Sequence, residues 1–199
     1  MKQVMMSLIG GLFLVVSGQG QAKKVDIKVG KNAFETCRGC HSSPNASNVY
    51  PTYYVPKIGG QRKEYIASAL TAYKHEARAR SSMLANTYDL TDQVIEALAA
   101  YIEISAGKKS KAPYTGSPSA GEKLAGVCLS CHTDNLSDGA TGPILAGQYG
   151  NYLLKVMKEY QQGIRKDPVM QSMLADFTEE NLEDIASYFA NMNSLSVVR

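Results

Sequence analysis

Apolar residues recur at helical spacing in four segments of the chain, and these segments form two matching pairs. The first pair carries its stripe at Tyr65, Ile66, Ala69, Leu70 and Tyr73, and at Tyr152, Leu153, Val156, Met157 and Tyr160. The second pair carries it at Val94, Ile95, Leu98, Tyr101 and Ile102, and at Leu182, Ile185, Ala186, Tyr188 and Phe189. Spacing of three and four residues predicts amphipathic helices, whereas no stretch alternates with period two. The pattern therefore predicts an all-α protein.

Helix start signals sharpen this prediction. Thr91-Asp92 and Thr178-Glu179-Glu180 place an N-cap residue and first-turn acids before the second pair of stripes. Two shorter helices are expected at residues 31–36 and 122–127, each behind a glycine (Gly30, Gly121) that lies seven residues before a cysteine. Phe34 and Leu124 are the large apolar residues expected to face inward there.

These matched elements indicate a tandem repeat. The offset between equivalent residues is 91 at the first elements and 87 from residues 56–61 and 143–148 onward, so the first repeat has four extra residues in the loop 42–54. That loop is rich in Ser, Asn, Pro and Tyr, and either shapes a partner-specific surface or is a tolerated insertion. Gly, Pro, Ser and Lys between the repeats mark a linker. We predict an N-terminal domain at 23–106, a linker at 107–118 and a C-terminal domain at 119–199.

The N-terminus has the pattern of a secretory signal peptide over residues 1–22. Lys2 gives a positive start, residues 8–16 form an apolar run, and Gly20 and Ala22 are small residues at the cleavage positions. A run of about nine residues is too short to span a bilayer as a helix, although a retained anchor is the alternative. Cleavage after Ala22 would release the chain into the periplasm.

The four cysteines occur in two C-x-x-C-H motifs, Cys37-Cys40-His41 and Cys128-Cys131-His132. This motif attaches c-type haem: two thiols reach one edge of the porphyrin, and the histidine lies under the iron. A thioredoxin-type disulfide would need a βαβ context, and a zinc site would have to join pairs 91 residues apart. We predict two covalently attached haem c groups, with His41 and His132 as proximal iron ligands.

Methionine is the expected sixth ligand in each repeat. Met83 and Met170 align at the 87-residue offset and precede the matched threonine caps. Met173 is the alternative in the second repeat, although it aligns with Asn86, which could not ligate in the same way. His75, the remaining histidine, lies in a polar stretch and aligns with Gln162.

Histidine and methionine together fill the iron coordination. A thioether favours reduced iron and raises the haem potential, and a filled sixth position leaves no site for oxygen or peroxide. Both properties indicate electron transfer at fairly positive potential rather than catalysis.

The chain resembles the cytochrome c4 family, dihaem cytochromes built from two class I cytochrome c domains. The resemblance rests on the paired motifs, the Pro-x-x-x-Gly-Gln segments, the Arg-to-Met spacing and the terminal Tyr-containing helices. It implies that Pro56 and Pro143 offer carbonyl groups to His41 and His132, and that the haems face each other across the domain interface. It further implies that the leading helices cross the final helices near Gly30 and Gly121. Arg78 and Arg165, with the paired tyrosines, are implied neighbours of the propionates or the interface.

Charge is distributed unevenly along the expected mature chain. Residues 23–111 have 14 basic and 8 acidic side chains, a net +6, and residues 112–199 have 6 basic and 10 acidic, a net −4. Such a dipole can orient a docking partner, although a solvated surface explains the same numbers.

The sequence thus predicts a periplasmic electron carrier between a quinol-oxidising or dehydrogenase donor and a terminal oxidase or reductase. Its expected partners are redox proteins and not nucleic acid, and peripheral association with a membrane stays open. The alternative is a cytochrome subunit of a larger oxidoreductase, such as a sulfide-oxidising flavocytochrome. A dihaem peroxidase would need an iron with an open sixth position, whereas both repeats offer a methionine.

Overall fold

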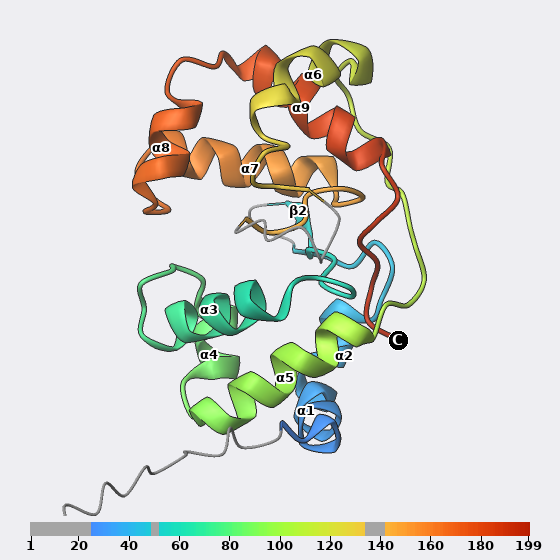
Figure 1. Ribbon diagram of the computed structural model, residues 1–199, viewed down its shortest axis with the longest axis vertical. Coiled ribbons are helices and arrows are strands. Elements are labelled where there is room, and N and C mark those ends of the chain that lie inside the picture. The colour runs from blue at the N-terminus through green and yellow to red at the C-terminus, as the bar shows by residue number, and fades with distance from the viewer. Residues whose placement is uncertain (1–24, 49–51, 134–141) are drawn as a thin grey trace, which may run out of the picture.

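The computed structural model describes residues 25–48, 52–133 and 142–199, which form two stacked helical units (Figure 1). The predicted signal peptide lies outside these residues. The first unit contains α1 (Ile27–Ala33), η1 (Phe34–Thr36), α2 (Arg38–His41), α3 (Lys63–Lys74), α4 (Ser81–Thr87) and α5 (Asp92–Ile104). The second contains α6 (Pro118–Leu124), η2 (Ala125–Val127), α7 (Gly150–Gln161), α8 (Pro168–Leu174) and α9 (Glu179–Asn191). The predicted all-α tandem repeat is confirmed.

The first unit contains a pair of short strands that the sequence pattern does not predict. Strands β1 (Ser47–Asn48) and β2 (Tyr53–Tyr54) pair antiparallel within the loop that is longer than its counterpart. Four residues of strand are too few to show period-two alternation, so the sequence pattern gives no sign of them. Among the described residues, no helix has the length and apolar character needed to cross a membrane.

The leading helix of each unit begins earlier than predicted, because polar caps precede the apolar residues. The Asp26 carboxylate accepts a hydrogen bond from the Lys28 backbone N–H at 2.8 Å, which starts α1 at Ile27. In the second unit, the Ser117 hydroxyl caps α6. The residues just before each C-x-x-C-H motif then continue as the 3₁₀ turns η1 and η2.

The threonine caps of the final helices are confirmed. The Thr91 hydroxyl accepts from the Val94 N–H at the start of α5. At the start of α9, Thr178 and Asn181 form a reciprocal capping box, in which each side chain accepts from the other residue's N–H.

Each unit is closed by a close crossing of its first and last helices at a glycine, as the resemblance implied. A Cβ atom on Gly30 would lie 2.0 Å from the Ala97 carbonyl oxygen of α5. One on Gly121 would lie 2.0 Å from the Asp184 carbonyl oxygen of α9. The expected inward residue Phe34 is fully buried beside the first crossing, with its ring 5.6 Å from that of Tyr101.

The end of the chain returns from the second unit to the first. The connecting segment, residues 105–117 between α5 and α6, runs beside the C-terminal tail from one unit to the other (Figure 1). The Gly107 N–H donates to the Val197 carbonyl at 2.9 Å. Gly59 and Ser196 exchange two backbone hydrogen bonds, and the Val198 N–H donates to the His41 carbonyl at 3.0 Å. The tail therefore ties the two units together, while the boundaries 23–106 and 119–199 stay a prediction.

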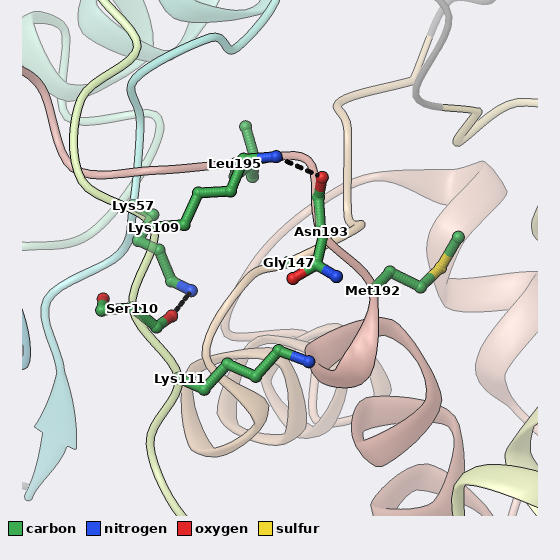
Figure 2. Close-up of a pocket in the computed structure, with 8 residues that line it drawn as sticks. All are labelled: Lys57, Lys109, Ser110, Lys111, Gly147, Met192, Asn193 and Leu195. Atoms are coloured by element: carbon green, nitrogen blue, oxygen red, sulfur yellow. Dashed lines mark hydrogen bonds between the residues drawn. The ribbon is translucent and has the colours of Figure 1, made fainter.

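Three lysines fasten the connecting segment around a small pocket of about 230 Å³ (Figure 2). Lys109 donates to the Asn193 carbonyl at 2.8 Å, and Lys111 donates to the carbonyl of Asn191, the last residue of α9, at 2.9 Å. Lys57 donates to the Ser110 carbonyl, and burial, followed by the charge of Lys111, lowers its pKa to about 8. Ammonium groups are favoured at the carbonyl end of a helix, so Lys111 stabilises the end of α9, and Lys109 binds the chain just beyond it.

We predict that Gly121→Ala destabilises the protein by about 3 kcal/mol, because the new methyl group meets backbone that can move only with the whole helix. Gly126→Ala is the matched control: nothing lies within 4 Å of a Cβ there, and we expect a change below about 1 kcal/mol. Thermal unfolding followed by circular dichroism measures both. Equal destabilisation by the two substitutions would contradict the crossing as the cause.

Candidate functional site

Both C-x-x-C-H motifs form a single helical turn. His41 N–H donates to the Cys37 carbonyl at 3.0 Å, and His132 N–H donates to the Cys128 carbonyl at 2.9 Å. In such a turn, residues three and four apart lie on one face. Each cysteine pair therefore shares a face with the histidine that follows it, and none of the four cysteines is paired in a disulfide.

The histidine of each motif is held by the carbonyl group of a proline. The Nδ1 atom of His41 lies 3.0 Å from the Pro56 carbonyl oxygen, and that of His132 lies 2.8 Å from the Pro143 oxygen. Because a carbonyl can only accept, Nδ1 carries the proton and Nε2 is left with a free lone pair. Burial lowers the pKa of both imidazoles, although the carbonyl hydrogen bonds oppose it, which favours the neutral form that binds metal. These two contacts confirm the pairing that the resemblance implied.

The two motifs open into one continuous cavity of about 790 Å³ between the units. Its walls include apolar residues of α3 and α7, which lie opposite each other across the interface (Figure 1). The predicted site residues that line it are Cys37, Cys40, His41, Met83, Cys128, Cys131, His132 and Met170.

The alternative ligand Met173 and the remaining histidine, His75, lie elsewhere. Met173 is 44% exposed and, like His75, does not line the cavity. Met157 of α7 does line it, which the repeat alignment did not single out. The residue at its position in the first repeat is Leu70, which also lines the cavity and has no ligating atom.

Arginines and tyrosines in the wall of this cavity connect the units. Arg78 donates to the Tyr65 hydroxyl at 3.3 Å and, across the interface, to the Tyr152 hydroxyl at 3.0 Å. Arg165 donates from the second unit to the same Tyr65 hydroxyl at 3.2 Å. Burial raises the pKa of Tyr65, but the two guanidinium groups outweigh burial and bring it to about 8. The arginines are therefore interface residues, one of the two placements the resemblance implied.

A second polar contact crosses the interface near the C-terminal end of α7. The Glu159 carboxylate pairs with Arg80 of the first unit and with Lys155 of its own helix. The Glu159 side chain is only 14% exposed and Arg80 is 27% exposed, so water screens this contact less than a surface pair. Lys155 also lies over the ring of Tyr53, from the β2 strand.

The site residues fit covalently attached haem in both units. A buried neutral imidazole with Nε2 free, two thiols on the same turn and an adjoining cavity with a largely apolar lining match the needs of an iron porphyrin. In the described residues, no three His, Cys, Asp or Glu side chains converge on a metal-ion site, which gives the zinc alternative no support. The fold and the site thus define a c-type cytochrome with one haem attachment site in each unit.

Comparison with known proteins gives the family. Cytochrome c4 of Stutzerimonas stutzeri is 26% identical over 97% of this chain and 100% of its own. Cytochrome c-554(548) of Halomonas halodenitrificans is 35% identical, with 38% of this chain covering 96% of that protein. The solved structure of cytochrome c4 from Acidithiobacillus ferrooxidans superposes with a TM-score of 0.67 and 26% identity, over 80% of this chain and 99% of that one. The chain belongs to the cytochrome c4-like family of dihaem cytochromes c, electron-transfer proteins with two covalent haem c groups.

A further relative is the protein named thiosulfate dehydrogenase electron acceptor of Stutzerimonas stutzeri (strain A1501), 28% identical over 96% of this chain and 97% of its own. No family model matches the chain.

We predict that Glu159→Gln lowers stability by about 1–3 kcal/mol, because it leaves Arg80 and Lys155 without their carboxylate partner in a half-buried place. Glu179→Gln is the control, since Glu179 is 64% exposed and pairs within one unit; we expect less than about 1 kcal/mol. The measurement is the thermal midpoint at low and high salt. An equal loss in both variants would contradict a special contribution from the interface pair.

Proposed function

We propose that His41 and Met83 ligate the iron of the first haem and that His132 and Met170 ligate the second, with Cys37, Cys40, Cys128 and Cys131 forming the thioether bonds. The support is that these residues line the shared cavity and keep the repeat register. Met170 is favoured over Met173 because only Met170 lines the cavity.

When bound, each haem supplies an iron that cycles between the +2 and +3 states. The chain contributes a fixed neutral imidazole, a soft thioether sulfur and an enclosure that limits contact with water. Pro56 and Pro143 hold the Nδ1 proton of each imidazole, so that Nε2 is the nitrogen available to iron. A rigid, closed coordination needs little rearrangement between oxidation states, which suits electron transfer.

We predict that Met170→Ala removes one of the two methionine–iron charge-transfer absorptions of the oxidised protein and lowers the potential of one haem, since thioether ligation favours reduced iron. Met173→Ala should leave the absorption and both potentials unchanged, because its side chain lies outside the cavity. A redox titration followed optically measures both. Loss of the absorption in Met173→Ala instead would reverse the assignment.

We further propose that the protein carries electrons in the bacterial periplasm, from a quinol-oxidising complex or a dehydrogenase to a terminal oxidase or reductase. The observation that carries this proposal is the single cavity that both haem attachment motifs line, because it brings two one-electron sites within one enclosure. The relative named thiosulfate dehydrogenase electron acceptor supports a sulfur-oxidising dehydrogenase as donor.

The uneven charge favours different partners at the two units, because opposite fields steer opposite docking faces. We predict that substitution of the exposed Lys31 of α1, Lys31→Glu, changes the reduction or the oxidation rate with one partner about two- to tenfold at low salt, and that high salt removes the effect. Substitution of the exposed Lys123 of α6, Lys123→Glu, makes the same charge change in the second unit and should affect the other partner.

Stopped-flow reduction by a thiosulfate dehydrogenase, and oxidation by a terminal oxidase, test both variants. If neither variant changes either rate, or both slow the same step equally, docking does not use the charge difference. Unchanged rates would leave the ligand assignment intact, because the spectra report it independently.

A further inference from the structure

The peptide group between Pro56 and Lys57 makes two hydrogen bonds at once. Its carbonyl oxygen accepts from His41 Nδ1 at 3.0 Å, and its N–H donates to the Oε1 atom of Gln148 at 2.9 Å. Gln148 belongs to the second unit, and its Nε2 amide also donates to the Lys57 carbonyl at 2.8 Å. A side chain of one unit thus holds the peptide that orients the histidine of the other.

The second unit has the mirror arrangement. The peptide between Pro143 and Ile144 accepts from His132 Nδ1 at 2.8 Å and donates to Gln61 Oε1 at 2.8 Å. Gln61 Nε2 donates back to the Ile144 carbonyl at 3.0 Å. Gln61 and Gln148 occupy equivalent positions of the repeat, so the contact is reciprocal.

The orientation of both amides is determined by their surroundings. Each Oε1 atom also accepts a hydrogen bond from the backbone N–H of the next residue in the sequence. This residue is Arg62 for Gln61 and Tyr149 for Gln148, both at 3.0 Å. A rotated amide would bring its NH₂ group against two N–H donors. Gln61 is 3% exposed and Gln148 is 5% exposed, so water does not compete for these bonds.

A peptide group is planar and conjugated, so a hydrogen bond at its N–H strengthens its oxygen as an acceptor. A stronger acceptor at Pro56 draws the Nδ1 proton of His41 and makes the imidazole a better electron donor to metal. Better donation stabilises oxidised iron.

We infer that Gln61 and Gln148 are positioning residues that act across the interface, each tuning the reduction potential of the haem in the opposite unit. This inference rests on the proposed ligation of iron by His41 and His132. It makes docking of the two units part of the redox chemistry, because each histidine reaches its full donor strength only when the other unit is in place.

The test substitutes the glutamines in the full-length dihaem protein. Gln148→Met keeps the side-chain length and removes all three hydrogen bonds of the amide, two of which join it to Lys57. It should raise the reduction equilibrium constant of the first haem about two- to threefold, roughly 20–30 mV for a one-electron couple. Gln61→Met should do the same for the second haem. Haem methyl and histidine NMR signals, assigned through contacts with Ile66 or Leu153 of the same unit, identify which haem responds.

Two further variants separate tuning from general damage. Gln148→Glu keeps an acceptor for the Lys57 N–H, so the first haem should return to the wild-type potential or fall below it. Gln161→Ala loses two amide-to-carbonyl bonds to Leu174 and Phe177 within the second unit, and should leave the first haem unchanged.

A shift confined to the haem of the substituted unit, an equal shift of both haems, or no shift would overturn the inference. So would a raised potential in Gln148→Glu. The wild-type spectra show beforehand whether both irons carry histidine and methionine, so a failure of the proposed ligation is distinguishable from a failure of this inference.

Discussion

The close crossing of the first and last helices limits where every other element of each unit can lie. Backbone meets backbone at Gly30 and Gly121, and the C-x-x-C-H turn follows the crossing helix after one 3₁₀ turn. The crossing thereby fixes where the cysteines and the histidine lie relative to the final helix. The remaining helices of each unit, α3 with α4 and α7 with α8, pack on that unit's own apolar cluster and also line the cavity between the units. Covalent attachment of haem suits such a fold, because loss of the haem would leave this cavity unfilled.

Buried polar groups join the two units across their interface. The glutamine amides and the Arg78–Tyr152 contact cross it with directional hydrogen bonds, while the cavity beside them is largely apolar. Buried polar groups are costly unless all of them are paired, so such an interface specifies one docking geometry more sharply than an apolar one. A fixed docking geometry also fixes the position of one haem attachment site relative to the other.

Most of the fold and much of the site were predictable because the repeat supplies an internal alignment. The register of the repeat matches Met83 with Met170, and the matched glycines Gly30 and Gly121 indicate where the helices cross. The same alignment matches Gln61 with Gln148. It does not predict their contacts, because the sequence of a repeat carries no information on what lies across an interface. The return of Val198 to His41 was equally hidden, since it joins segments at opposite ends of the chain. Helix starts were misplaced where a polar cap, Asp26 or Ser117, precedes the apolar pattern.

Duplication makes the two units alike, but their surroundings make the two haem sites unequal. The Val198 N–H of the C-terminal tail donates to the carbonyl of His41. Among the described residues, the tail makes no equivalent backbone bond to His132. Arg62 of the first unit donates to the Thr133 carbonyl next to His132. Burial is the main cause that lowers the pKa of that imidazole, and the charge of Arg62 adds to it. A positive charge near an iron also favours the reduced, less positive state. Both differences arise from contacts between the units, so the surroundings of the two haem sites can differ while the residues of the two C-x-x-C-H motifs stay the same.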